Sequence, residues 1–269
     1  MAACLFSAID MLFKTFLAML AASALASPVH AQWTSALGIA ARQFTLNEYD
    51  AAGRRIVREQ GWLPGLEGRL AYRSGEWTLS AQASHYQHDI AYHGQTQSGV
   101  PVDSRTGTAL TQSGAGIAYA VNTMLSASLA VELERWRRDI QDVGRVRGLQ
   151  ERTLSRRALL GLDAKFPTTY GEGMAGAALL FAAPEKLRVG FSGQFDDVSF
   201  DTRPAHGMRL GLGWQPAAWP NLELHAGLDW WKVGRSADAA LSRNGRHAGT
   251  VAQPEHAVTS MRLAVLYRF

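Results

Sequence analysis

Short stretches in which apolar and polar residues alternate recur along almost the whole chain. The clearest covers residues 125–133, where leucine, alanine or valine fills every second position and serine, alanine or glutamate the positions between. Residues 258–269 repeat the pattern and end on an aromatic residue. A period of two residues is typical of a β-strand with one apolar and one polar face. The sequence therefore predicts an all-β protein.

The segments between the predicted strands are of two kinds. Long polar loops are expected at 93–112 and 235–256. Short turns are expected at four positions: Gly75, Asn122, Glu185 and Asn221. Short turns on one side and long loops on the other are typical of transmembrane β-barrels. Four short turns, with both chain ends on the same side as the turns, predict a closed antiparallel barrel of about ten strands.

The strand count depends on residues 135–184. This region holds two further strand-like runs, at 158–166 and 175–183. If both runs form one long bulged strand, the barrel has ten strands, although a turn-like segment lies between them. If a partner strand lies within residues 144–157, the barrel has twelve, but several arginines and glutamates would then lie near lipid, which costs free energy. We expect ten strands and keep twelve as the alternative.

The first 31 residues have the features of a secretory signal peptide. A basic residue precedes an apolar run at 15–26, which is too short to span a bilayer as a helix. Small residues suit cleavage after Ala31. We expect residues 1–31 to be removed on Sec-dependent export and residues 32–269 to form the barrel domain. Cys4, the only cysteine, would leave with this segment, so we expect no disulfide or thiol nucleophile in the mature chain.

The C-terminus resembles the closing strand of bacterial outer-membrane β-barrels. In those proteins a terminal Phe with an aromatic residue two positions before it is the usual assembly signal, and here Phe269 and Tyr267 hold these places. The resemblance implies residence in the outer membrane of a Gram-negative envelope. It also implies contact with outer-membrane lipid and lipopolysaccharide, and assembly by the barrel-assembly machinery. We expect the protein to be a monomer.

Composition narrows the functional classes. Hydrophobic residues make up 47% of the chain, yet the mean hydropathy is −0.10, which argues against a helical membrane protein and fits a barrel whose strands present one face to lipid. The net charge of +4 comes without a long block of like charge, so nucleic acid is not an expected partner. No residue spacing suggests a metal site or a phosphate-binding loop, and we expect no cofactor.

Charged residues recur on the predicted inward face of the strands. A barrel of about ten strands has a narrow lumen that side chains largely fill, so charges there should be paired. We predict a lumen charge network of ten residues: Arg42, Glu67, Arg69, Glu132, Glu134, Arg188, Arg209, Glu223, Asp229 and Arg262. Such a network either closes the barrel as a salt-bridged plug or forms a polar track for a small solute.

The leading functional hypothesis is non-enzymatic: a narrow pore, a surface-binding protein or an envelope or export component. The alternative is an outer-membrane hydrolase with a site at the extracellular rim. In size and expected strand number the chain is similar to omptins, proteases that use Asp pairs facing a His–Asp pair, and a lipid A-modifying enzyme is the second analogy. The candidate catalytic residues are His88, Asp89, Asp196 and Asp197. Each pair is adjacent in sequence, so its members point to opposite faces of a strand.

Overall fold

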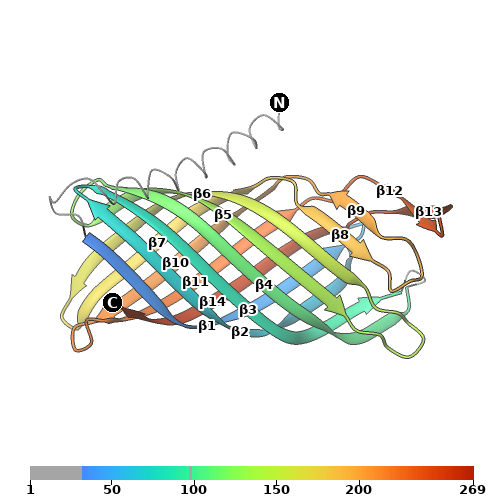
Figure 1. Cartoon of the computed structure of the whole chain (residues 1–269), viewed down its shortest axis with the longest axis horizontal. Coiled ribbons are helices and arrows are strands. Elements are labelled where there is room, and N and C mark those ends of the chain that lie inside the picture. The colour runs from blue at the N-terminus through green and yellow to red at the C-terminus, as the bar shows by residue number, and fades with distance from the viewer. Residues whose placement is uncertain (1–31, 97–98) are drawn as a thin grey trace.

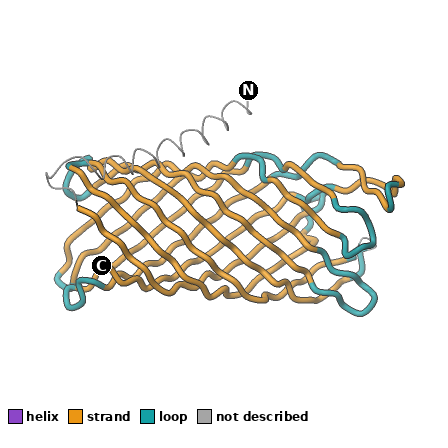
Figure 2. The backbone as a smooth tube through the Cα atoms, viewed as in Figure 1, coloured by secondary structure: helices purple, strands orange, loops and turns teal. Residues whose placement is uncertain are grey.

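The computed structural model describes residues 32–96 and 99–269, and the predicted signal peptide lies outside this part of the chain. The described residues form fourteen β-strands, ten of which close into one antiparallel barrel (Figures 1 and 2). The barrel strands are β1 (Gln32–Tyr49), β2 (Arg55–Ser74), β3 (Trp77–Gln95), β4 (Pro101–Ala120), β5 (Leu125–Ile140), β6 (Gln150–Thr168), β7 (Gly171–Ala182), β10 (Ala205–Pro216), β11 (Leu222–Val233) and β14 (Glu255–Arg268). Among residues 32–96 and 99–269, no helix is long and apolar enough to cross a membrane.

The barrel closes through its first and last strands. β1 pairs with β2 on one side and with β14 on the other, in a register that places Leu37 opposite Tyr267 and Ile39 opposite Val265. The remaining strands pair in chain order, with β7 joined directly to β10. Both β1 and β14 therefore reach the end of the barrel that carries the short turns, which we call the short-turn end (Figure 1).

The expectation of ten strands is confirmed, but two strands were assigned wrongly. The runs at 158–166 and 175–183 belong to two separate strands, β6 and β7, joined by a tight turn at residues 169–170. The single bulged strand is therefore wrong. The twelve-strand alternative is wrong too, because the residues that would have supplied the hidden strand, 144–157, lead into and form the first half of β6.

The fourth short turn also lies elsewhere. It is the turn at residues 169–170, whereas Glu185 lies at the opposite end of the barrel, just before the short strand β8 (Lys186–Gly190). A short turn at Glu185 would lead into a barrel strand beginning near Leu187, where apolar and polar residues alternate. In the structure Leu187 lies on β8, which continues the sheet beyond the ten barrel strands, and it packs in a small apolar core that produces the same two-residue period.

The barrel strands extend well beyond the length that a membrane requires. β2 has 20 residues, whereas about 9–11 suffice to cross a bilayer. The predicted loop at 93–112 mostly forms the upper parts of β3 and β4, and the charged segment at 135–157 contributes to β5 and β6. These parts lie above the exposed apolar band, where the outer face of a strand is polar, and their composition therefore resembles that of loops.

The outer face of the barrel carries an apolar band next to the short-turn end. Its exposed side chains include Leu37, Ile39, Leu66, Leu70, Leu129, Leu160, Leu179, Leu212, Leu263 and Val265. Aromatic pairs border this band at the short-turn end, where the rings of Trp77 and Tyr119 lie 4.9 Å apart. An apolar exterior bordered by aromatic residues is the surface that a transmembrane β-barrel presents to lipid.

The end opposite the short turns carries what we call the crown, residues 183–204 and 234–254. The crown contains β8, β9 (Val198–Asp201), β12 (Ala239–Arg243) and β13 (Arg246–Val251) (Figure 1). β8 pairs with the upper part of β6 and extends the barrel wall, and β9 pairs with β8. Leu187, Val189, Val198 and Phe200 bury their side chains with Leu241 from the second hairpin. The crown is thus a packed structure with its own apolar core.

Candidate functional site

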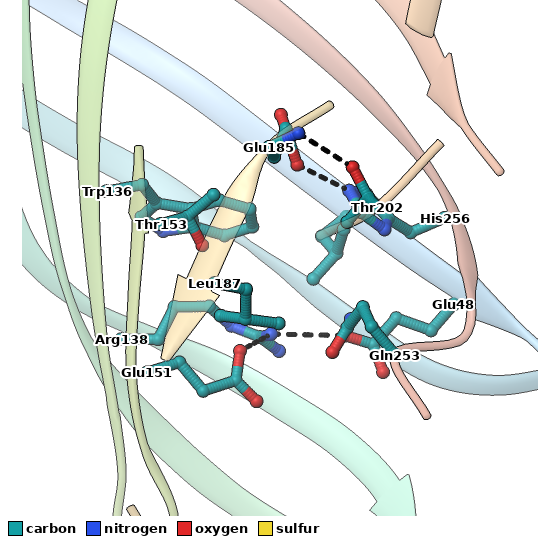
Figure 3. Close-up of a pocket in the computed structure, with 11 residues that line it drawn as sticks. Glu48, Trp136, Arg138, Glu151, Thr153, Glu185, Leu187, Thr202, Gln253 and His256 are labelled. Carbon is teal, nitrogen blue, oxygen red and sulfur yellow. Dashed lines mark hydrogen bonds and ion pairs between the residues drawn. The ribbon is translucent and has the colours of Figure 1, made fainter. Parts of the chain in front are cut away.

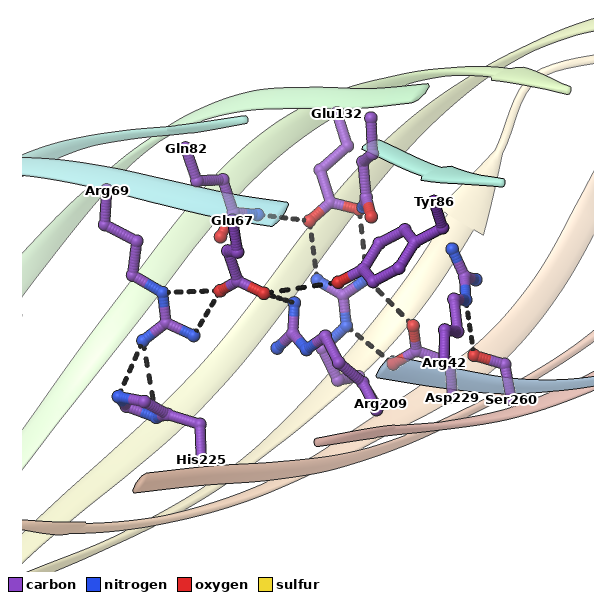
Figure 4. Close-up of polar contacts among 12 residues, drawn as sticks. Arg42, Glu67, Arg69, Gln82, Tyr86, Glu132, Arg209, His225, Asp229 and Ser260 are labelled. Atoms are coloured by element: carbon purple, nitrogen blue, oxygen red, sulfur yellow. Dashed lines mark hydrogen bonds and ion pairs between the residues drawn. The ribbon is translucent and has the colours of Figure 1, made fainter. Parts of the chain in front are cut away.

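Near the short-turn end of the lumen, Arg69 lies between an acid and a histidine (Figure 4). Its Nη2 lies 2.7 Å from Glu67 Oε1, and its Nη1 lies 3.1 Å from His225 Nε2. His225 also contacts Glu223 at 3.1 Å, and Arg268 lies 3.9 Å from that glutamate. Because strands β2, β11 and β14 each direct alternate residues inward, charges distant in sequence meet here in complementary pairs.

At the next level, Arg209 from β10 joins two acids from other strands (Figure 4). Its Nη1 lies 2.5 Å from Glu132 Oε1, and its Nε lies 2.7 Å from Asp229 Oδ1. Gln82 and Gln112 donate hydrogen bonds of 2.8 and 2.6 Å to the two carboxylate oxygens of Glu132. Five strands thus contribute to one polar cluster, which ties opposite walls of the barrel together.

Farther up, Glu134 lies between two arginines. Arg42 Nη1 and Arg157 Nη2 lie 3.1 and 2.5 Å from its two oxygens, and all three side chains are at most 3% exposed. Arg42 also donates a 2.7 Å hydrogen bond from Nε to Ser260 Oγ. The Arg157 guanidinium lies 4.2 Å from the ring centroid of Trp231, within the range of a cation–π contact. This triad carries one positive charge in excess.

Apolar side chains fill the lumen around and above the triad. One cluster of buried residues draws on nine of the ten barrel strands, all except β6. Six of its largest members are at most 1% exposed: Phe44, Leu63, Tyr86, Leu110, Leu180 and Trp231. Buried side chains from nine strands meet in this one cluster and leave little room for water between them. The lumen is therefore densely packed at this level.

Above the apolar cluster, Arg138 holds three glutamates. It lies 3.1 Å from Glu48, 2.7 Å from Glu59 and 2.5 Å from Glu151, and each of these side chains is at most 9% exposed. Figure 3 shows its contacts with Glu48 and Glu151. A cavity of about 10 Å³ adjoins this group, which is room for about one water molecule. Trp136 lines the cavity, and its Nε1 is buried without a hydrogen-bond partner among the described residues.

A second buried contact joins this group to the crown. His256 Nε2 on β14 lies 3.5 Å from Glu185 Oε2, and both side chains are at most 5% exposed (Figure 3). The backbone N–H of Glu185 donates to Thr202 Oγ1 at 2.9 Å. Both ends of the hairpin that carries β8 and β9 are therefore anchored over the lumen.

Nine residues of the predicted lumen network lie in the barrel and contact an opposite charge, including Arg262, which is 3.6 Å from Glu67. Arg188 is the exception and requires a correction. It is exposed on β8 and pairs with Asp197 at 2.9 Å, because β8 is a crown strand. The predicted network does not include the group around Arg138, because Arg138 and Glu151 lie between the strand-like runs at 125–133 and 158–166. The alternating pattern at 132–138 continues through it and was the available signal.

The candidate catalytic residues are not brought together as a catalytic pair by any recorded contact. His88 and Asp89 are exposed on β3, and Asp89 Oδ2 accepts a 3.4 Å hydrogen bond from Gln141. Asp197 pairs with Arg188. A His–Asp contact does form at the rim, where His93 Nδ1 lies 2.8 Å from Asp103 Oδ1, but both side chains are more than half exposed. The catalytic assignment of these residues stays a prediction.

Asp196 joins the two crown hairpins. Its carboxylate accepts hydrogen bonds from Gly245 N–H at 3.0 Å, Ser242 Oγ at 2.7 Å and Asn244 N–H at 3.1 Å. These donors, first of all the Gly245 amide, hold the pKa of the Asp196 carboxyl below its ordinary value of 3.8. With three such donors, the Asp196 carboxylate has a structural role: it links the two hairpins of the crown.

We predict that the amide proton shifts of Asn244 and Gly245 titrate together in acid. Because the pKa of Asp196 is lowered by folding, its contribution to stability is present above the ordinary carboxyl pKa and is lost as pH falls through the lowered one. NMR in detergent micelles should therefore show one inflection below the ordinary range. In Asp196→Asn the inflection should vanish, and an inflection in the ordinary range in the native chain would contradict the contact.

No group of three or more histidine, cysteine, aspartate or glutamate side chains in the described part of the chain has the arrangement of a metal site. The acids of the lumen instead contact arginines, as the distances above show. The chemistry that the lumen offers is that of a rigid, charge-paired interior.

Comparison with known proteins identifies the fold. No family model matches the sequence, and no curated protein matches it. The outer membrane protease OmpT from Escherichia coli is similar in structure, with a TM-score of 0.53 and 10% identity over 90% of this chain and 98% of that one. The translocator domain of the autotransporter NalP from Neisseria meningitidis gives a TM-score of 0.48 with 14% identity, over 97% of this chain and 96% of that one. The fold is that of a bacterial outer-membrane β-barrel.

Proposed function

We propose that this chain is a closed outer-membrane barrel that acts at the cell surface through its crown, as a surface-binding protein and not as a pore. One observation carries the proposal: buried apolar side chains from nine strands fill the lumen, and the largest of them are almost inaccessible to solvent. A pore needs a continuous aqueous path, and a packed, charge-paired interior favours rigidity instead. The packed crown supplies a surface of defined shape above the membrane.

The crown is proposed to face the outside of the cell. Outer-membrane barrels have short turns in the periplasm and long connections outside, and here the crown is opposite the short turns (Figure 1). The proposed assembly signal, Tyr267 and Phe269, lies at the short-turn end, with the two rings 5.1 Å apart. Its role in assembly stays a prediction from the sequence.

The hydrolase alternative has weaker support. OmpT is a protease, but a likeness at 10% identity concerns the fold alone. A rim hydrolase needs an acid or histidine free to activate water. Asp196 already accepts three hydrogen bonds and Asp197 pairs with Arg188, which favours structural roles for both acids. We therefore prefer the surface-binding proposal.

Cysteine labelling tests the proposed orientation. Arg246 is exposed at the tip of the crown, and Tyr170 is 76% exposed in a short turn. Apart from Cys4, in the predicted signal peptide, the chain has no cysteine, so Arg246→Cys and Tyr170→Cys would each carry a single thiol. We expect a membrane-impermeant maleimide to label Arg246→Cys in intact cells and Tyr170→Cys only after the outer membrane is permeabilised. The reverse pattern would contradict the proposal.

A further inference from the structure

Five exposed basic side chains gather on the outer face of the barrel wall. Strand register places Arg137 opposite Arg152 and Arg152 opposite Arg188, so three arginines form a row across β5, β6 and β8. Two positions lower along the strands, Arg135 and Lys186 flank Leu154 in the same way. We call these five residues the basic cluster.

The basic cluster borders a groove in the surface. Arg152, Lys186 and Arg188 line it together with Ser199 and Asp201 from β9, and its volume is about 330 Å³. Three acids lie nearby. Asp197 pairs with Arg188, Asp201 is opposite Lys186 in the strand register, and Asp139 is exposed two positions above Arg137 on β5. The five cations of the basic cluster and these three carboxylates leave a net charge of +2, so the cluster favours an anion with more than one charge.

The position of the groove indicates what kind of anion it meets. Directly below it, on the same part of the wall, the exposed side chains are Leu133 on β5, Leu160 on β6 and Phe181 on β7. These belong to the apolar band that faces lipid. The outer face of β1 offers no comparable charge above the band, where Gln43, Thr45 and Asn47 are uncharged. The basic cluster therefore lies on a different side of the barrel from β1, directly above the apolar band.

We propose that this groove binds the phosphorylated headgroup of lipopolysaccharide in the outer leaflet. Its phosphates would contact Arg152, Lys186 and Arg188, and its acyl chains would lie against the leucines and phenylalanine below. Arginine forms paired hydrogen bonds with phosphate oxygens, and lysine adds a compact positive charge. The inference rests on the proposed function, because it requires the crown to face the outer leaflet.

Binding of bisphosphorylated lipid A to the purified mature protein in detergent tests the proposal. The variant Arg152→Glu/Lys186→Glu reverses two charges in the groove. We expect it to bind lipid A at least about tenfold more weakly than the native protein, since each cation near a charged lipid surface contributes roughly a factor of five. The matched control, Arg55→Glu/Arg246→Glu, reverses two exposed charges at other hairpins and should bind as the native protein does.

Two further arms identify the ligand. Lipid A stripped of its phosphates should bind the native protein at least about tenfold more weakly, and inorganic phosphate should not displace lipid A. Equal binding by the groove variant and the native protein would overturn the proposal, as would displacement by inorganic phosphate at a similar concentration, which would indicate a site for a soluble anion.

Folding and orientation are checked separately. The unfolding midpoint in phosphatidylcholine vesicles reports whether the groove variant is folded, and Arg152→Gln/Lys186→Gln replaces it if it is not. The cysteine labelling described above tests the orientation alone. If the crown is labelled in intact cells but the groove variant binds lipid A as tightly as the native protein, the proposed lipid site is wrong and the proposed function stands. If the crown is labelled only after the outer membrane is permeabilised, the proposed function is wrong, whatever the affinity for lipid A.

Discussion

Arg138→Met is expected to lower the free energy of unfolding by about 3–5 kcal/mol. Arg138 is within 3.1 Å of each of three buried carboxylates, those of Glu48, Glu59 and Glu151. Without the guanidinium these acids lose the cation they share and repel one another in a site that solvent barely reaches. Urea unfolding in phosphatidylcholine vesicles, followed by tryptophan fluorescence, measures the effect.

Arg137 provides the control for this experiment, because it is the preceding residue of the same strand and is exposed. Arg137→Met should change the unfolding free energy by no more than about 0.5 kcal/mol. A charge-free variant, with Arg138→Met and each of the three glutamates replaced by glutamine, should recover most of the loss, since it leaves no charge unpaired. Equal midpoints for Arg138→Met and Arg137→Met would contradict the assigned role of Arg138.

Glu134→Leu is expected to destabilise the barrel more than removal of the whole triad. The single change leaves Arg42 and Arg157 buried without their shared carboxylate, at a cost of about 3–5 kcal/mol. One guanidinium nitrogen of each arginine already lacks a hydrogen-bond partner among the described residues, so neither has a spare acceptor nearby.

The triple variant Arg42→Met/Glu134→Leu/Arg157→Met should have an unfolding midpoint near or above that of the native protein. Replacing a complete buried ion group with apolar residues of similar size is often neutral or stabilising, and here the surrounding cluster is already apolar. The same urea unfolding measures it. If the triple variant is less stable than Glu134→Leu, the triad contributes net stability, and the expectation that its replacement is neutral or stabilising is wrong.

The number of strands and the closure of the barrel could be predicted because lipid imposes a simple rule. Where the outer face meets lipid, each strand must alternate, as residues 125–133 and 258–269 do. Above the lipid, the outer face of a strand meets water, and this alternation is no longer required. The outer face of β4 and β5 there is polar, with residues such as Arg105 and Arg135, so the upper part of β4 has the composition of a loop and the upper part of β5 that of a charged segment.

Alternation can also arise for another reason. Leu187 and Val189 alternate because β8 packs one face into the crown core and exposes the other, and no lipid is involved. From sequence alone the two causes give the same period. This explains why Glu185 was assigned to a short turn and Arg188 to the lumen.

Inward-facing residues could be predicted from their position in a strand, but their partners could not. Arg42 and Glu134 are 92 positions apart, on strands β1 and β5, which do not pair with each other. Their contact crosses the lumen and depends on the register and tilt of every strand between them. The sequence therefore predicts which kinds of residue fill the lumen, but it does not predict which of them form ion pairs across it.

Electrical recording across a planar bilayer tests the central claim most directly, since the claim is that side chains close the lumen. The purified native protein, inserted in an oriented bilayer, should give no stepwise current under applied voltage, even when unfolding and surface-labelling assays show that it is folded and inserted. Steady, reproducible unitary conductance from the same preparation would contradict a closed barrel and indicate that the protein is a pore.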